Sequence, residues 1–206
     1  MKVIALNGSP HGGGVIAGGI NVMKGELEKE GVSVEVVHVG SKNIQGCTAC
    51  RKCAALKKCV IEGDAVNECR GKLESADGII LGSPVYYGSI AGTFKCFLDR
   101  LFFSGLNMKY KVGAVVVSLR RTGGISTFHQ LVNYFNLGQI ILTPSVYWQV
   151  IHGNNPEELA RDEEGVQLME IQGRNMAWLL KALEAGVKAA PPPPKVERKR
   201  TNFIRV

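Results

Sequence analysis

The chain has 206 residues, of which 45% are hydrophobic and 21% are charged, a composition typical of one soluble globular domain with a full core. No apolar run reaches the roughly 18 residues of a membrane-spanning helix, and residues 1–14 break into glycine before a signal-peptide core could form, so we expect a cytoplasmic protein without a membrane partner. The net charge of +7 is concentrated in residues 42–59 and 188–206, where no basic helix with interleaved aromatic residues occurs, so we expect no nucleic-acid partner.

The first half of the chain alternates between strand and helix patterns. Residues 2–8 form a short continuous apolar run, which predicts a strand buried on both faces. Apolar residues at helical spacing between 16 and 27 predict a helix that ends at Gly31. Residues 32–39 then predict a second strand and residues 65–75 a second helix.

The second half continues the same alternation. Three further buried strands are predicted, at residues 77–84, 111–118 and 139–148. Helices are predicted at 89–105 and 125–137, followed by a last helix at 156–185 with a bend near Gly165 or Gly173.

Strands that alternate with helices predict an α/β fold with a parallel sheet covered on both faces. Five strands in this rhythm fit a flavodoxin-like doubly wound sheet of order 2-1-3-4-5, with ligands at the carboxyl ends of the strands. We therefore expect one domain at 1–188, with a cysteine-rich loop at 46–62. Residues 189–206 should form a Pro-rich basic C-terminal arm, because proline cannot continue a helix, and we expect this arm to contact a neighbouring subunit.

Residues 7–14, "NGSPHGGG", connect the first strand to the first helix. Glycines let backbone N–H groups approach an anion, and the following helix N-terminus is electropositive. The alternative is a flexible turn, since the loop matches neither a P-loop nor G-x-G-x-x-G. The candidate anion-binding residues are Ser9, His11, Gly12, Gly14, Val15 and Ile16.

Two more loops follow the third and fourth predicted strands. "GSPVYYGS" offers two flat amphipathic rings, and we expect one of the two tyrosines to pack in the core. "SLRRTGG" offers arginines that can neutralise a phosphate or support an anionic ring. The candidate ring-binding residues are Pro84, Val85, Tyr86, Tyr87, Gly88, Ser118, Arg120, Arg121 and Gly123.

Four of the six cysteines stand close together, in the pattern C-x2-C-x2-C-x5-C. They are Cys47, Cys50, Cys53 and Cys59. This spacing favours a 4Fe–4S cluster, whose negative charge the neighbouring basic residues would offset. Zinc, free thiols or a redox disulfide remain alternatives, although cytoplasmic thiols are usually reduced. Cys69 and Cys96 lie on apolar helix faces and are interpreted as core residues.

The order of "GSP", the cysteines, "ADGIILGSPVYYGSIAGTFKCFLDRL" and a later "GG" resembles the NAD(P)H-dependent FMN reductase superfamily. More narrowly, the compact cysteine pattern followed by "CVIEGD" resembles the iron-sulfur flavoproteins, and the resemblance covers about residues 1–185. It implies FMN, a 4Fe–4S cluster on the four cysteines, and a homodimer or homotetramer. Val15-Ile16 stands where the family commonly has Asn-Thr, and His11 where arginine is common, which predicts weaker FMN affinity.

No nucleophile elbow, paired carboxylate or metal-ligand set of histidines is evident, so the cofactors must supply the chemistry. We expect an FMN protein with a 4Fe–4S cluster that passes electrons between a donor such as ferredoxin and an acceptor. The alternative enzyme is an NAD(P)H-dependent FMN or quinone reductase without a functional cluster. A non-catalytic electron carrier or redox sensor is the alternative of another class.

Overall fold

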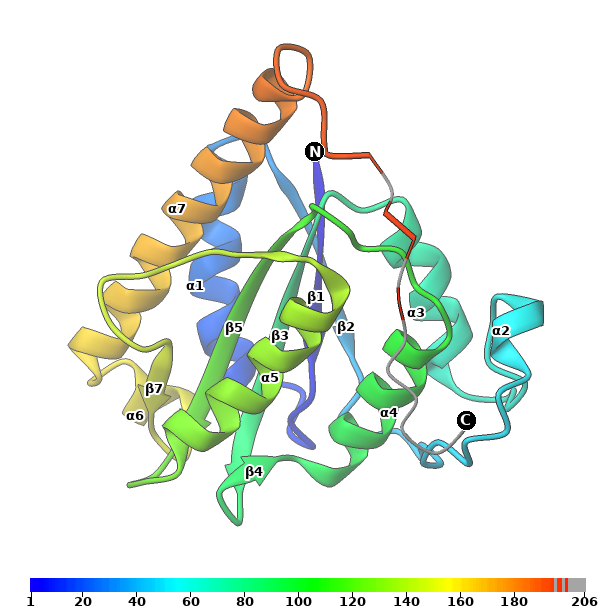
Figure 1. Ribbon diagram of the computed structural model, residues 1–206. Coiled ribbons are helices and arrows are strands. Elements are labelled where there is room, and N and C mark those ends of the chain that lie inside the picture. The colour runs from blue at the N-terminus through cyan, green and yellow to red at the C-terminus, as the bar shows by residue number, and fades with distance from the viewer. Residues whose placement is uncertain (195, 198, 200–206) are drawn as a thin grey trace.

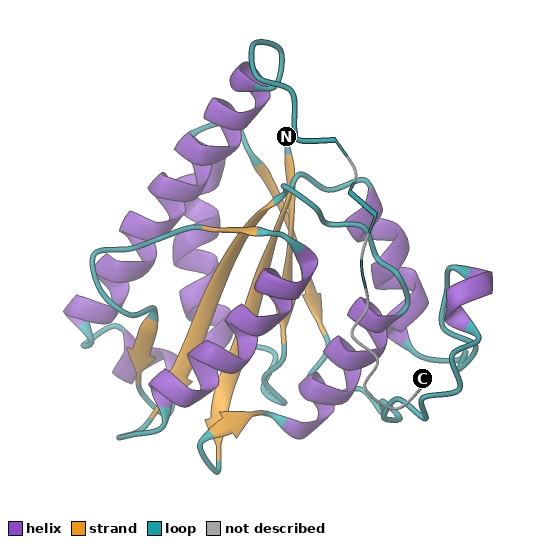
Figure 2. Cartoon of the chain, in the orientation of Figure 1, coloured by secondary structure: helices purple, strands orange, loops and turns teal. Residues whose placement is uncertain are grey.

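The computed structural model describes residues 1–194, 196–197 and 199, which form a parallel sheet with helices on both faces (Figures 1 and 2). The sheet order β2-β1-β3-β5-β6 confirms the doubly wound, flavodoxin-like fold. The main strands are β1 (Lys2–Asn7), β2 (Ser33–His38), β3 (Gly78–Tyr86), β5 (Val112–Leu119) and β6 (Ile141–Leu142). Two short strands, β4 (Ser89–Ile90) and β7 (Val150–His152), pair with β3 and β5 and bring the described sheet to seven strands, where five were predicted.

Each face of the sheet has its own hydrophobic core, because side chains alternate between the faces along every strand. One core packs Val3, Ala5 and Ile80 against α1 (Val15–Lys29) and α7 (Glu163–Gly186). The other packs alternate strand residues such as Ile4 and Leu6 against three helices. These helices are α3 (Ala65–Glu74), α4 (Gly92–Phe103) and α5 (Gly124–Gly138). Strands buried on both sides explain why β1, β3 and β5 read as continuous apolar runs.

The prediction of one strand at 139–148 is wrong. Within this interval only Ile141–Leu142 is a strand, and the next strand, Val150–His152, begins after it. Both pair in parallel with β5, the first at the start of β5 and the second at its end. The interval contains Pro144, which has no N–H for a sheet hydrogen bond.

The predicted bend in the last helix is also misplaced. The chain forms α6 (Pro156–Leu159) and then α7, whose N-cap Asp162 accepts a hydrogen bond from the backbone N–H of Gly165. Gly173 lies inside α7, where a Cβ atom would stand 2.9 Å from Cβ of Glu26. Glycine at this position is therefore explained by the close packing of α7 on α1, and no bend is needed to account for it.

Two predicted boundaries remain to be compared with the structure, the helix end at Gly31 and the C-terminal arm. Gly31 follows α1 with φ of +76°, as expected for a left-handed residue after a helix. Residues 191–194 form neither helix nor strand, and the later part of the predicted arm lies mostly outside the described residues. Within the part of the chain that is described, no helix has both the length and the apolar character needed to cross a bilayer.

Candidate functional site

The three predicted loops meet at the carboxyl edge of the sheet. Parallel register places Asn7 of β1 beside Gly82 of β3, and Pro84 of β3 beside Ser118 of β5. The backbone N–H of Gly8 donates to the carbonyl oxygen of Gly82 at 2.8 Å. Loop 7–14 therefore lies next to the loops that follow β3 and β5.

Loop 7–14 is held by polar side chains, of which sequence reasoning missed Asn7 and His38. Asn7 is 1% exposed, and its Oδ1 accepts a hydrogen bond from the N–H of Ser9 at 3.0 Å. The Oγ of Ser9 accepts from the N–H of His11 at 3.1 Å. From β2, Nε2 of His38 donates to the carbonyl oxygen of Ser9 at 2.8 Å. The sequence held one signal for Asn7, because an asparagine at the end of a buried apolar strand needs hydrogen-bond partners.

The same loop presents backbone donors. The structure gives the N–H groups of Gly12, Gly13, Val15 and Ile16 no acceptor among the described residues. The N-cap of α1, Gly14, contributes no side-chain cap. Unpaired N–H groups and the positive end of the helix dipole together favour an anion here.

The side chains of this loop contribute little beyond its shape. Val15 and Ile16 are 6% and 0% exposed and pack in the core that α1 shares with the sheet, so only their backbone can face a ligand. His11 is exposed, and Ser9 is 5% exposed. The predicted anion-binding residues are therefore brought together, but their binding of FMN stays a prediction.

The second and third loops touch each other. Gly123 has φ of +93°, and a Cβ atom there would lie 2.9 Å from Cγ1 of Val85 and 3.1 Å from Cα of Gly88. The hydroxyl of Ser126 donates to the carbonyl oxygen of Gly88 at 2.6 Å. A glycine at 123 is thus required both by backbone conformation and by close approach.

The expectation that one tyrosine of the second loop packs in the core is wrong. Tyr86 is 46% exposed and Tyr87 is fully exposed, and Tyr87 has a φ of +51°. Arg120 and Arg121 are exposed as well. Flat rings and guanidinium groups are therefore exposed near the carboxyl edge of the sheet, where a planar ligand could reach them.

The four clustered cysteines line one small pocket. Its volume of about 20 Å³ would admit about one water molecule. The structure places no group of three or more Cys, His, Asp or Glu side chains closely enough to hold a metal ion, among the residues it describes. Ala49, Arg51 and Lys57 have positive φ, and alternation of such residues with right-handed ones turns backbone N–H groups toward a shared concavity, as in many anion and Fe–S sites. The thiols and these turns fit a cluster chemically, but the pocket would have to open to admit one, and the cluster stays a prediction.

Arg100 of α4 ties the cysteine loop to the domain. Its side chain has 0% exposure, and its five N–H donors are all used. Nε donates to Sγ of Cys59 at 3.3 Å, and the terminal nitrogens reach the carboxylate of Asp64. They also reach the carbonyl oxygens of Gln45 at 3.1 Å and Ile61 at 2.8 Å. One guanidinium therefore holds both ends of the loop.

The two remaining cysteines follow the prediction in part. Cys69 is 0% exposed in the core beneath α3, where burial raises the pKa of its thiol to about 11. Cys96 is only partly buried and packs against the same core. Neither lines the pocket of the other four.

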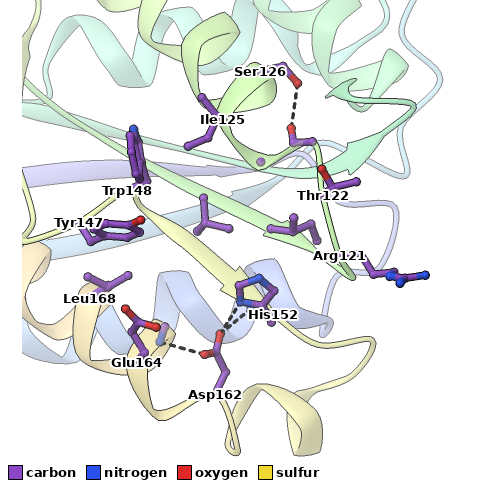
Figure 3. Close-up of a pocket in the computed structure, with 15 residues that line it drawn as sticks. Arg121, Thr122, Ile125, Ser126, Tyr147, Trp148, His152, Asp162, Glu164 and Leu168 are labelled. Atoms are coloured by element: carbon purple, nitrogen blue, oxygen red, sulfur yellow. Dashed lines mark hydrogen bonds and ion pairs between the residues drawn. The ribbon is translucent and has the colours of Figure 1, made fainter.

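A larger pocket of about 490 Å³ lies beside the third loop, and sequence reasoning did not find it (Figure 3). It takes Arg121 and Gly123 from that loop, the aromatic pair Tyr147 and Trp148 from before β7, and His152 from β7 itself. Its lining is assembled from segments up to about fifty residues apart, so no single motif could reveal it. Among the histidines, His152 lines this pocket, whereas His129 does not.

Comparison with known proteins gives consistent relatives. Residues 1–155 match the NADPH-dependent FMN reductase family. An iron-sulfur flavoprotein of Methanocaldococcus jannaschii is 31% identical over 193 residues, covering 89% of this chain and 100% of the relative. An iron-sulfur flavoprotein of Methanosarcina thermophila is 28% identical, covering 89% of this chain and 97% of the relative.

Solved structures share the fold at low identity. RosB, solved with bound 8-demethyl-8-formylriboflavin-5'-phosphate, has a TM-score of 0.71 at 18% identity, covering 100% of this chain and 92% of that one. A flavodoxin from the domain Archaea has a TM-score of 0.60 at 16% identity, covering 88% and 99%.

Proposed function

Because the chain belongs to the NADPH-dependent FMN reductase family and is therefore a flavoprotein oxidoreductase, we propose that it also carries a 4Fe–4S cluster on its cysteine loop. It passes electrons between a one-electron donor, such as a ferredoxin, and an acceptor. NAD(P)H is an alternative donor. The working unit is a homodimer or homotetramer.

The observation that carries this proposal is the gathering of Cys47, Cys50, Cys53 and Cys59 around one pocket. Four thiols on one loop are the ligand set that a cubane cluster needs. The N–H···S hydrogen bond from Arg100 to Cys59 is the kind of contact that stabilises a thiolate ligand and shifts a cluster's potential. The relatives described above are named iron-sulfur flavoproteins, which supports an iron-sulfur group in this chain.

Different loops of the chain would hold the phosphate and the ring of FMN. The free N–H groups at the start of α1 would hold the FMN phosphate, and Ser9 would add its hydroxyl. The loops around Gly88 and Gly123 would hold the ring, and the exposed tyrosines would shield it from water. FMN supplies exchange of one or two electrons and the cluster supplies exchange of one.

Single cysteine variants test the cluster. Cys47→Ser, Cys50→Ser, Cys53→Ser and Cys59→Ser should each lose most of the iron and acid-labile sulfide of anaerobically prepared protein, because the four ligands act as a set. FMN should remain, since its loops come from other strand ends. Cys69→Ser and Cys96→Ser are the matched controls and should keep the iron. Equal iron in all six variants would refute the ligand assignment.

A reductase without a functional cluster is the second candidate. It is favoured by the small size of the cysteine pocket, which would have to open to admit a cluster. Steady oxidation of NADPH by FMN-loaded protein that contains neither iron nor zinc would support it. Dependence of acceptor reduction on a one-electron donor and on iron content would exclude it.

A further inference from the structure

The pocket of about 490 Å³ has the size and lining of a small-molecule site. It lies at the β7 edge of the sheet, between the first turn of α5 and the first turn of α7 (Figure 3). Leu119, Val150 and Leu168 give it an apolar lining, and Ile125 contributes from α5. Only its Arg121 and Gly123 side overlaps the residues that we assign to FMN.

Two aromatic side chains stand open on one side of this pocket. Tyr147 and Trp148 are 59% and 42% exposed, although both are large rings that proteins usually cover. Their ring centroids lie 4.7 Å apart at an angle of 79°, an edge-to-face contact that fixes both rings. Exposed, mutually fixed rings in a concave surface are suited to stacking on a flat ligand.

The polar end of the pocket is organised around His152. Its backbone N–H donates to Oδ2 of Asp162 at 2.6 Å, and its ring Nδ1 lies 3.3 Å from the same oxygen. The other oxygen of Asp162 is held by the N–H of Gly165 at 3.1 Å. A carboxylate only accepts hydrogen bonds, so Nδ1 carries the proton that faces it. The structure gives Nε2 of His152 no partner among the described residues, which leaves this nitrogen for a ligand.

The charges around the pocket restrict the ligand further. Asp162 and Glu164 both line it, opposed by the single guanidinium of Arg121. Two carboxylates against one cation disfavour phosphate-bearing ligands such as a dinucleotide. We propose that this pocket binds an uncharged, planar ligand of two or three fused rings, which stacks on the face of one ring of the Tyr147–Trp148 pair, contacts the other ring at its edge and donates one hydrogen bond to Nε2 of His152. This binding does not depend on FMN being held by the neighbouring loops.

Tryptophan fluorescence tests the proposal, because the chain has only two tryptophans. Trp178→Phe replaces a side chain that is 70% exposed on α7 and leaves Trp148 as the sole reporter. The probe is 2-amino-3-methyl-1,4-naphthoquinone, which is flat and neutral, has an amino N–H that can donate to Nε2, and has no free quinone ring position to which a thiol could add. The full chain is titrated with saturating FMN present, so that the probe cannot enter the flavin loops, and again without FMN.

Saturable quenching at one site per chain is expected in both titrations. Tyr147→Ala should weaken binding by about three- to tenfold, the worth of one aromatic contact. His152→Ala should weaken it by about two- to tenfold, the worth of one hydrogen bond. Val146→Ala is the control, because Val146 is 70% exposed and does not line this pocket, and it should bind as the parent does. These side chains are exposed, so the variants should fold.

Three outcomes would overturn the proposal. Quenching that rises linearly with probe would mean collision without binding, and unchanged binding in Tyr147→Ala would place the probe elsewhere. Trp148 emission that shifts with protein concentration alone, together with a rising mass in light scattering, would show that a second copy covers this face. If the protein fails to retain FMN, the proposed function fails, but the titration without FMN still decides whether this pocket binds.

Discussion

Removal of the Arg100 guanidinium should detach the cysteine loop. Arg100→Met keeps a long side chain but leaves the carboxylate of Asp64, which is 9% exposed, without its cation. The carbonyl oxygens of Gln45 and Ile61 lose their donors in the same step. Removing one partner of a buried ion pair costs about 3–5 kcal/mol. At about 2–4 °C of melting temperature per kcal/mol for a chain of this size, Arg100→Met should melt about 6–20 °C below the parent.

The matched control is Lys95→Met on the same helix. Lys95 also pairs with an aspartate, Asp99, but their side chains are 45% and 40% exposed. An exposed pair contributes at most about 1 kcal/mol, so this variant should melt within a few degrees of the parent. The double variant Arg100→Met with Asp64→Asn should recover part of the loss, because the amide removes the stranded charge and can still cap α3.

Thermal melts and thiol labelling, both on iron-free protein, check this reasoning. If the loop detaches by itself while the domain stays folded, the melting temperature falls less, but Cys59 should react with a thiol reagent far faster than in the parent. A melting temperature and a Cys59 labelling rate that both match the parent would refute the role that we give to Arg100.

Three further predictions follow from other parts of the structure. Ser9→Asp should abolish FMN retention in gel filtration by placing like charge beside the phosphate, whereas Ser33→Asp, at the opposite edge of the sheet, should keep it; retention by both variants would move the phosphate site. Hydrogen bonds from Arg174 and then from Lys29 hold the pKa of Glu26 below its usual value. This carboxylate therefore stabilises the fold above its unfolded-state pKa of about 4.3 and loses that effect as the pH falls through its lower folded-state pKa. Glu26→Gln should accordingly lower the unfolding free energy at pH 7, the deficit shrinking in urea titrations as the pH falls below about 4; a deficit independent of pH would indicate lost packing instead. In protein stripped of iron, Cys69, with its raised pKa of about 11, should resist iodoacetamide at pH 8 under conditions that label the exposed Cys47 and Cys50; equal labelling by mass spectrometry would contradict its burial.

The fold could be predicted from sequence where one residue pattern had one physical meaning. β1 and β5 are buried on both faces, so they appear as continuous apolar runs. The segment 139–148 is just as apolar, yet most of it is not strand, because Pro144 interrupts the ladder and the aromatic pair turns outward. Local composition could not distinguish a buried strand from an exposed apolar segment.

Some residues of the candidate site could also be predicted from the sequence, and others could not. Loops that follow parallel strands must meet at one edge, so the three groups of residues around Ser9, Gly88 and Gly123 could be predicted from chain order alone. The roles of His38 and Asp162 could not, because each acts on a segment distant in sequence or depends on the exact end of a helix. The burial of Arg100 could have been predicted from one feature of the sequence, because Arg100 shares the apolar face of α4 with Phe94, Phe97 and Leu101. A charge on such a face must have buried partners.

Native mass spectrometry of freshly prepared anaerobic protein tests the central claim most directly, because it counts both groups on the same molecule. We predict a mass per chain that exceeds the polypeptide by one FMN and one 4Fe–4S cluster, the cluster increment disappearing in Cys50→Ser while the FMN increment stays. A parent protein that carries FMN alone, or FMN with one zinc ion, would contradict the cluster and leave the plain reductase as the function of this chain.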